Sequence, residues 1–226
     1  MKLTLKKFTI YLTVIMMIFT TAVAVMPEKK AQAAQETYDG QIWKIANVRL
    51  RKTAKENGKT ICKIKKGKTV QVYYTSGSWR KVSYNGKIGW VKKKYVFIKT
   101  NAPSVSNMDT TAKGATVASF AQRFVGNPYV WGGTNLNSGA DCSGFVGAVY
   151  KRFGYNLPRS SSSLRTAGKK VSAKNMQPGD LVCYSGHVAM YIGNGKIVHA
   201  SSRKTGIKIS DNYRYRSVVA IRRIVK

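Results

Sequence analysis

Cys142 lies in a context suited to a reactive thiol, the stretch GADCSGFVGAVY. The apolar spacing predicts a helix over residues 141–153 that starts at the cysteine, with Gly154 as its stop. Because a helix N-terminus carries partial positive charge, we expect it to lower the pKa of the thiol and favour the nucleophilic thiolate. A buried, inert helix cysteine is the common alternative, and Cys142 considered alone favours that alternative.

The chain has two histidines, His187 and His199, and both fall in the segment HVAMYIGNGKIVHA. A thiol nucleophile needs a base, and histidine is the usual one. The segment reads as two strands of a hairpin, so the two histidines are candidates for a base and a polar residue that orients it. One structural and one exposed histidine is the alternative.

The loop of this hairpin decides whether the histidines share a face. A three-residue loop, Gly193-Asn194-Gly195, pairs Ile192 with Lys196 and sets Ala189 opposite His199, which places both imidazoles on one face. A two-residue loop places them on opposite faces. The two glycines favour the three-residue loop, since such loops take glycine at a left-handed position.

The remaining cysteines, Cys62 and Cys183, lie in strand-like runs and are expected in the core. No CxxC pair accompanies the two histidines, so we expect neither a metal site nor a cofactor.

Residues 38–99 read as short strands separated by turn residues, with Asn85-Gly86 a strong hairpin signal. They predict a small all-β barrel. A polar linker over residues 100–111 follows.

From residue 112 the pattern changes to an α+β domain that extends to residue 226. Val117, Phe120, Ala121 and Phe124 recur at helical spacing and predict a helix that ends by Gly126. Antiparallel strands are expected afterwards, at Asp180–Tyr184, His187–Ile192, Lys196–Ala200 and Val218–Val225.

The N-terminus indicates export. A basic head, an apolar run and the Ala31-Gln32-Ala33 site predict a signal peptide over residues 1–33, with an uncleaved membrane anchor as the alternative. The full chain has 40 basic and eight acidic residues, and cleavage after Ala33 leaves a net charge of +28. We expect a secreted, wall-associated protein of a Gram-positive-like bacterium, with anionic wall polymers as partners rather than nucleic acid or, after cleavage, a membrane.

Two resemblances follow from longer motifs. The run NVRLRKTAKENGKTICKIKKGKTVQVYYTSGSWRKVSYNGKIGWVKKKYV resembles a bacterial SH3-type domain. The stretches NPYVWGGTN, GADCSGFV, LPRSS, PGDLV and HVAMYIGNGKIVHA resemble, in order, the catalytic domain of the NlpC-type cell-wall cysteine peptidases. The second resemblance implies a papain-like fold in circularly permuted order.

The NlpC-type resemblance also implies roles for single residues. It makes Cys142 the nucleophile, His187 the general base and His199 the residue that orients the base. It implies oxyanion support from Tyr129. The implied substrate-lining residues are Trp131, Asp141, Ser143 and Ser161.

The expected activity is hydrolysis of the γ-D-glutamyl–diamino acid bond in peptidoglycan stem peptides by a cysteine endopeptidase. An amidase or acyltransferase on the same scaffold, or a wall-binding protein without activity, stays an alternative. Asp141 has two interpretations of its own: it pairs with a free α-amine of the substrate, or it caps the helix.

Overall fold

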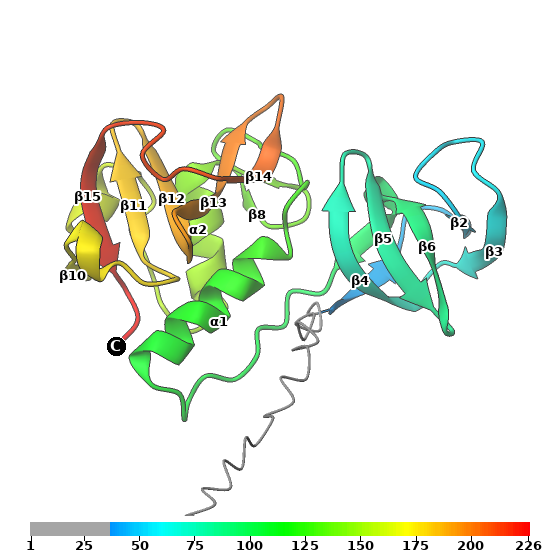
Figure 1. Cartoon of the computed structure of the whole chain (residues 1–226), viewed down its shortest axis with the longest axis horizontal. Helices are drawn as coiled ribbons and strands as arrows, with labels where there is room; N and C mark the ends of the chain where they lie inside the picture. The colour runs from blue at the N-terminus through cyan, green and yellow to red at the C-terminus, as the bar shows by residue number, and fades with distance from the viewer. Residues whose placement is uncertain (1–36) are drawn as a thin grey trace, which may run out of the picture. The chain divides into compact units, whose positions relative to one another are not determined.

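The computed structural model describes residues 37–226, so the predicted signal peptide lies outside the described residues. Figure 1 shows a β-rich region at the N-terminal side of the described chain and a mixed region of helices and strands after it. No helix among residues 37–226 is long and apolar enough to cross a membrane.

The first region is the predicted all-β fold. It is an antiparallel sheet with the strand order β3-β2-β6-β5-β4-β1-β7, curled around buried aliphatic side chains such as Leu50, Val72 and Val82. The strands are β1 (Tyr38–Ile42), β2 (Asn47–Arg51), β3 (Thr60–Lys65), β4 (Thr69–Ser76), β5 (Trp79–Tyr84), β6 (Lys87–Lys92) and β7 (Val96–Ile98). A 3₁₀ turn, η1 (Lys93–Tyr95), precedes β7.

The predicted hairpin turn is confirmed. Asn85 and Gly86 have φ angles of 47° and 72°, so both central residues adopt the left-handed conformation that a two-residue loop requires. They join β5 to β6, with Tyr84 opposite Lys87.

Arg80, on β5, is a fully buried cation that connects this sheet with the segment carrying Tyr129. It donates hydrogen bonds to the Val96 carbonyl at 2.6 Å and to the side-chain oxygen of Asn127. The Asn127 amide in turn donates to the Leu136 carbonyl at 2.7 Å. Through Arg80 and Asn127, the first sheet therefore helps to hold the loop of residues 127–136 in place.

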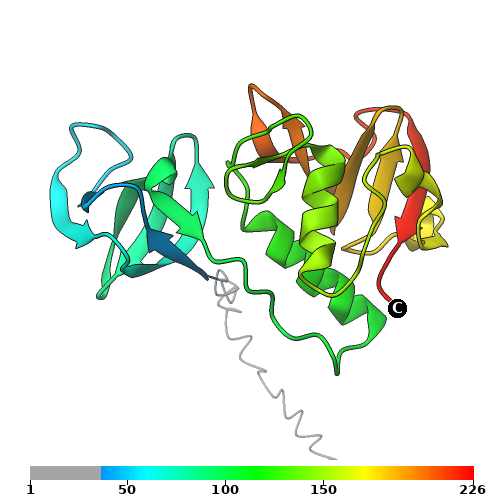
Figure 2. The same ribbon diagram turned by 180° about the vertical axis from the view of Figure 1, so that it is seen from behind.

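Two helices form one layer of the second region. Helix α1 (Thr110–Gln122) begins two residues before residue 112, where the domain was predicted to start, because Asp109 caps it by accepting from the Ala112 N–H. The predicted apolar face is buried. Helix α2 (Cys142–Lys151) ends earlier than the predicted residue 153, in a turn closed by Gly154 with a φ angle of 85°. Figure 2 shows the two helices on one side of the sheet that follows.

This sheet is antiparallel, with the strand order β10-β15-β11-β12-β13-β14. Its strands are β10 (Lys169–Lys170), β11 (Leu181–Tyr184), β12 (His187–Gly193), β13 (Lys196–Ser202), β14 (Gly206–Ser210) and β15 (Val218–Arg223). The four predicted strands are confirmed, and β10 and β14 are additional. Short 3₁₀ turns, η2 (Ser163–Thr166) and η3 (Ala173–Asn175), and a small ladder of β8 (Thr134–Asn135) with β9 (Gly139–Ala140) complete the fold.

The two faces of this sheet bury different groups. Val188, Met190 and Val198 pack with the helices, in the same cluster as Val146 and Phe120. Their neighbours along the strands, among them Ala189 and Ile197, pack on the opposite face with Tyr184 and Val182. The alternation along β12 and β13 follows from the two-residue repeat of a strand, and the histidines lie in this alternating pattern.

Candidate active site

Cys142 is the first residue of α2, as predicted, and Asp141 is its N-cap. The Asp141 carboxylate accepts from the Gly144 N–H at 2.7 Å, which fixes the first turn of the helix. Gly144 has to be glycine, since a Cβ there would lie 2.0 Å from the Gly133 carbonyl oxygen. The close approach of the 132–133 loop to the helix therefore explains why GG and CSG occur together in the sequence.

The two histidines meet as predicted. His187 Nε2 and His199 Nδ1 are 2.8 Å apart, and both side chains are buried. The strand register that produces this contact places Met190 opposite Val198 and Tyr191 opposite Ile197.

The predicted loop between them is wrong in detail. Gly193, not Ile192, pairs with Lys196, so the loop has two residues, Asn194 and Gly195, with φ angles of 50° and 73°. A bulge between Tyr191 and Gly193 restores the register that the three-residue loop was expected to give. The two histidines still lie on the same face of the sheet, as expected, because the extra residue lies in strand β12 and not in the loop.

The structure adds two partners of His199 that the sequence did not indicate. Its Nε2 lies 3.0 Å from Ser210 Oγ on β14, and its Nδ1 lies 3.4 Å from the Tyr215 hydroxyl. If His187 Nδ1 accepts the thiol proton, His187 Nε2–H donates to His199 and His199 Nε2–H donates to Ser210. One set of tautomers thus satisfies the whole chain from the base to the serine.

The thiol lies next to this chain of contacts. The backbone N–H groups of Val188, the residue after His187, and of Ser143 point to the Cys142 sulfur as donors and act to lower the pKa of the thiol. These donors favour the thiolate, but burial is the larger effect and raises the pKa of Cys142 above its ordinary value. The pKa of the Cys142 thiol is thus raised, and the lowering expected from the helix N-terminus is wrong.

Both imidazoles are neutral at pH 7. Burial, with Arg216 nearby, lowers the pKa of His187 to about 4. Burial and the neighbouring His187 lower the pKa of His199 to about 3. A neutral thiol beside a neutral imidazole is the resting arrangement, and the proton moves to His187 as the sulfur attacks.

Tyr129 and Trp131 lie in the loop before α2. Tyr129 forms a β-bridge with Ala140, and burial, followed by the charge of Cys142, raises the pKa of its phenol above the ordinary value. The hydroxyl is therefore a hydrogen-bond donor near the nucleophile. Trp131 is 77% exposed, so its ring is free to contact a ligand.

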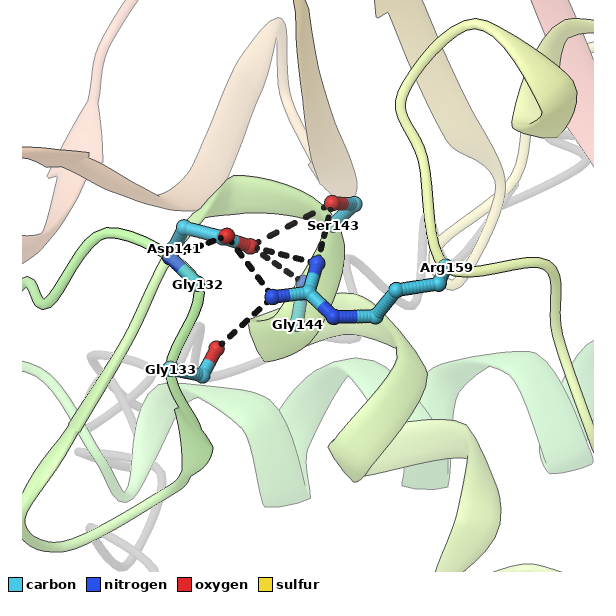
Figure 3. Close-up of polar contacts among 6 residues, drawn as sticks. All are labelled: Gly132, Gly133, Asp141, Ser143, Gly144 and Arg159. Atoms are coloured by element: carbon cyan, nitrogen blue, oxygen red, sulfur yellow. Dashed lines mark hydrogen bonds and ion pairs between the residues drawn. The ribbon is translucent and has the colours of Figure 1, made fainter.

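Asp141 is both a cap and part of an ion pair, drawn in Figure 3. Arg159 Nη1 and Nη2 donate to the two carboxylate oxygens at 2.9 and 2.8 Å, and Nη1 also reaches Ser143 Oγ at 2.8 Å. The structure thus brings Asp141 and Ser143 together with a residue that was not predicted. Ser161 lies half-buried in the loop after Arg159.

The other cysteines lie apart from this chemistry. Cys183 is fully buried on β11, and burial raises the pKa of its thiol to about 11. Cys62 is half-buried against the first sheet's core. Among residues 37–226, no three His, Cys, Asp or Glu side chains are grouped as metal ligands.

Comparison with known proteins gives two domain matches. Residues 126–223 match the NlpC/P60 family, and residues 46–97 match the bacterial SH3 domain. The resemblances predicted from the motifs are confirmed.

Two curated relatives match the chain in part. It is 31% identical over 145 residues to a γ-D-glutamyl-L-lysine dipeptidyl-peptidase of Bacillus cereus, which covers 58% of this chain and 40% of the relative. It is 39% identical over 104 residues to a bifunctional muramidase/DL-endopeptidase of Bacillus subtilis, which covers 42% of this chain and 31% of the relative. The matches span less than half the length of either relative.

A solved structure, NlpC1 from Trichomonas vaginalis, has a TM-score of 0.50 and 22% identity, covering 84% of this chain and 70% of that chain. At this identity the likeness concerns the fold, and it agrees with the predicted α+β domain preceded by an SH3-like barrel.

Proposed function

Residues 126–223 of this chain are an NlpC/P60 domain that follows a bacterial SH3 domain, and we propose that the protein is a secreted cysteine endopeptidase of peptidoglycan. We propose further that it cleaves the bond from the γ-carboxyl of D-glutamate to the diamino acid of the stem peptide. The names of the two relatives support this class of substrate. The single observation that carries the proposal is the chain of contacts from His187 through His199 to Ser210, which begins next to Val188, the residue whose backbone N–H acts on the Cys142 sulfur.

In the first step, His187 takes the thiol proton as the Cys142 sulfur attacks the γ-carbonyl carbon. The negative oxygen of the tetrahedral intermediate needs donors, and the candidates are the N–H groups at the start of α2 and the Tyr129 hydroxyl. Collapse of the intermediate breaks the C–N bond, and His187 returns the proton to the leaving amine. A thioester remains on the enzyme.

In the second step, a water molecule gives its proton to His187 and attacks the thioester carbon. The products are a fragment that ends in D-glutamate and a free thiol that takes back the proton. His199 holds His187 in one orientation throughout and shares the charge of the imidazolium with Ser210 behind it.

The barrel is proposed as the wall-binding part. Residues 38–99 contain 17 basic and two acidic residues. If their partner is an anionic wall polymer, the bound fraction in a cosedimentation assay with purified walls should fall steeply as salt is added, because screening weakens exposed charge pairs. Salt-independent binding would indicate an uncharged pocket instead.

The activity is tested by digestion of purified peptidoglycan and mass spectrometry of the fragments. New N-terminal diamino acids with matching D-glutamate ends support the proposed bond. Release of intact stem peptides would show an amidase, and larger joined fragments an acyltransferase. Export is tested separately, by N-terminal sequencing of the protein found outside the cells, where a start at Ala34 is expected.

A further inference from the structure

A cleft of about 350 Å³ is lined by residues of both the barrel and the peptidase domain. Five of its fourteen lining residues are cations: Lys44, Lys93 and Lys94 from the barrel, and Arg203 and Lys204 from the turn between β13 and β14. Among residues 37–226, no aspartate or glutamate lines it. The proposed mechanism gives this cleft no role, although cations from two domains gather in it.

These five cations have no carboxylate partner in the described part of the chain. Every described carboxylate contacts another group: Asp109 caps α1, and the others form ion pairs, namely Asp39, Glu56, Asp141, Asp180 and Asp211.

Arg80 adds a further cation behind the wall of the cleft, since its acceptors Val96 and Asn127 both line it. Arg80 is fully buried, and its third acceptor, the Thr75 hydroxyl, is neutral as well. Burial, and then the charge of Arg80, lowers the pKa of Lys93. An anion in the cleft would offset this repulsion.

Fixed contacts hold the walls of the cleft together. The Asn137 side chain accepts from the Ile98 N–H and donates to the Ile98 carbonyl, both at 2.9 Å, which ties its turn to the barrel. The Ile207 N–H donates to the Asn127 carbonyl at 2.9 Å, which holds the turn that carries Arg203 beside the same loop. The cations are therefore presented on a framework that is already ordered, and this lowers the cost of binding a ligand.

Lys44 has a strained backbone. Its φ angle is 69°, and the Ile45 N–H donates to the Trp43 carbonyl at 2.9 Å around it. Such a γ-turn with a positive φ is rare, and backbone strain of this kind is concentrated at binding and catalytic sites. The Lys44 ammonium lies over the Trp43 ring, 4.5 Å from its centroid. Trp43 Nε1–H is a buried donor without an acceptor among the described residues, and an oxygen of a ligand would satisfy it.

The lining favours a phosphodiester over other anions. Four of the five cations are lysines, which bind phosphate as point charges, whereas carboxylate recognition relies on the paired N–H groups of arginine. Among the described residues, the lining has one aromatic side chain, Trp43, and Lys44 already lies over its ring. Nucleobases bind by stacking on free aromatic faces, so a phosphate polymer without bases fits this cleft better than a nucleic acid.

We propose that this cleft binds a phosphodiester of an anionic wall polymer, and that the barrel and the peptidase domain each supply part of the site. The inference rests on the wall partner in the proposed function and extends it, because the charges of the barrel alone do not complete the site. Pro128 lines the cleft and directly precedes Tyr129. A bound polymer therefore lies next to the loop that leads to the nucleophile and holds the peptidase domain at the wall.

The test uses a short fluorescent poly(glycerol phosphate) chain as the probe, and fluorescence anisotropy measures its Kd for the full mature chain. Lys44→Asn with Lys93→Gln removes two charges from the barrel side, and asparagine accepts the positive φ of Lys44. Arg203→Gln with Lys204→Gln removes two charges from the peptidase side. Each double variant should raise Kd about tenfold, because exposed charge pairs contribute up to about fivefold each.

Matched controls remove the same charge elsewhere. Lys65→Gln with Lys66→Gln changes two exposed lysines of the barrel, and Lys169→Gln with Lys170→Gln changes two exposed lysines of β10. None of the four lines the cleft, so Kd should stay within about twofold of wild type. Urea denaturation verifies that each variant is folded.

Equal weakening by the control and the cleft variants overturns the proposal, because binding then follows net charge alone. Wild-type affinity in Arg203→Gln with Lys204→Gln also overturns it and leaves the barrel as the wall-binding part. Equal or tighter binding of single-stranded DNA, or of a glutamate oligomer, with the same charge overturns the choice of a phosphodiester without bases. Hydrolysis of a soluble stem peptide by the wild-type chain, without polymer, tests the proposed activity separately, so a failure there is distinguished from a failure of this site.

Discussion

Asp141 and Cys142 are neighbours at the start of one helix, yet the structure drives their ionisation in opposite directions. Burial disfavours both anions. For Asp141, the Arg159 guanidinium and two backbone N–H groups outweigh burial and hold the pKa below its ordinary value. For Cys142, backbone donors alone do not outweigh it, and the pKa is raised.

The comparison shows that a helix N-terminus does not by itself create a thiolate. Asp141 accepts from the Gly144 N–H, and the Arg159 guanidinium pairs with Asp141 as well. The thiol is left to be activated by a neutral base during the reaction. Asp141 stays ionised and holds the first turn of α2 in place, whereas Cys142 stays protonated until it reacts.

The largest effect is expected at the nucleophile. Cys142→Ala should lower peptidoglycan hydrolysis at least about 10⁴-fold, because no covalent intermediate forms without the sulfur. The free energy of unfolding should change by less than about 1 kcal/mol, since the side chain is only half-buried. Activity and urea denaturation are measured on the same preparation. A folded, active Cys142→Ala protein would refute the assignment of the nucleophile.

The two histidines should differ. His187→Ala removes the base and should lower kcat/KM by roughly 10³-fold. His199→Asn keeps a hydrogen-bonding group toward His187 Nε2 and should lower kcat/KM by about tenfold. The two variants are compared in peptide hydrolysis at one pH. Larger damage from His199→Asn than from His187→Ala would exchange their roles.

Thiol reactivity tests the comparison directly. With the pKa of Cys142 raised, the rate of alkylation by iodoacetamide should increase about tenfold from pH 7 to pH 8 and keep rising above it. Cys142→Ala, which retains Cys62 and Cys183, gives the background. A rate that is already constant between pH 6 and pH 8 would mean a preformed thiolate and would contradict the resting state described above.

The histidines also give stability a pH dependence. Their pKa values of about 4 and about 3 lie below the usual 6.5, so the unfolded chain binds protons that the folded chain does not. The stabilisation that the two neutral histidines give the folded chain is fully present above about pH 6.5. It is lost as pH falls toward 4, and the free energy of unfolding then decreases by up to about 1.4 kcal/mol per pH unit for each histidine. Urea denaturation between pH 7 and pH 4.5 should show this slope, and His199→Asn should reduce it by about half.

Local patterns in the sequence predicted much of the fold and of the site. The alternation along the two strands, together with the expected hairpin register, placed His187 and His199 on one face, and the helical spacing placed Cys142 at an N-terminus. The bulge at Ile192 was not predicted, because a bulge and a longer loop leave the same number of residues between the two strands.

Arg159 and Ser210 were not predicted from the sequence for a different reason. Arg159 lies 18 residues after Asp141, with a helix and a loop between them, so no periodicity relates the two side chains. Strand β14 (Gly206–Ser210) is a short edge strand that was not among the predicted strands. Only the folded sheet shows that it carries Ser210 to His199.

Ser210 should give the smallest effect, because it acts at the far end of the chain of contacts. Ser210→Ala removes the acceptor of His199 Nε2–H and leaves that buried donor unpaired. One neutral hydrogen bond is worth about 1 kcal/mol, so kcat/KM should fall about fivefold at pH 7. Ser202→Ala is the control, because its hydroxyl bonds only in the exposed turn that contains Thr205.

The pH profile separates a positioning role from a merely structural one. Without Ser210, His199 is less restricted to the tautomer that accepts from His187, so the acid limb of kcat/KM should shift while KM stays within about twofold of wild type. A fall in stability with an unchanged pH profile would make Ser210 a strand-edge residue of β14 only. A loss of a hundredfold or more would show instead that the serine belongs to the essential catalytic group, and that the chain of contacts acts as a unit from Cys142 to β14.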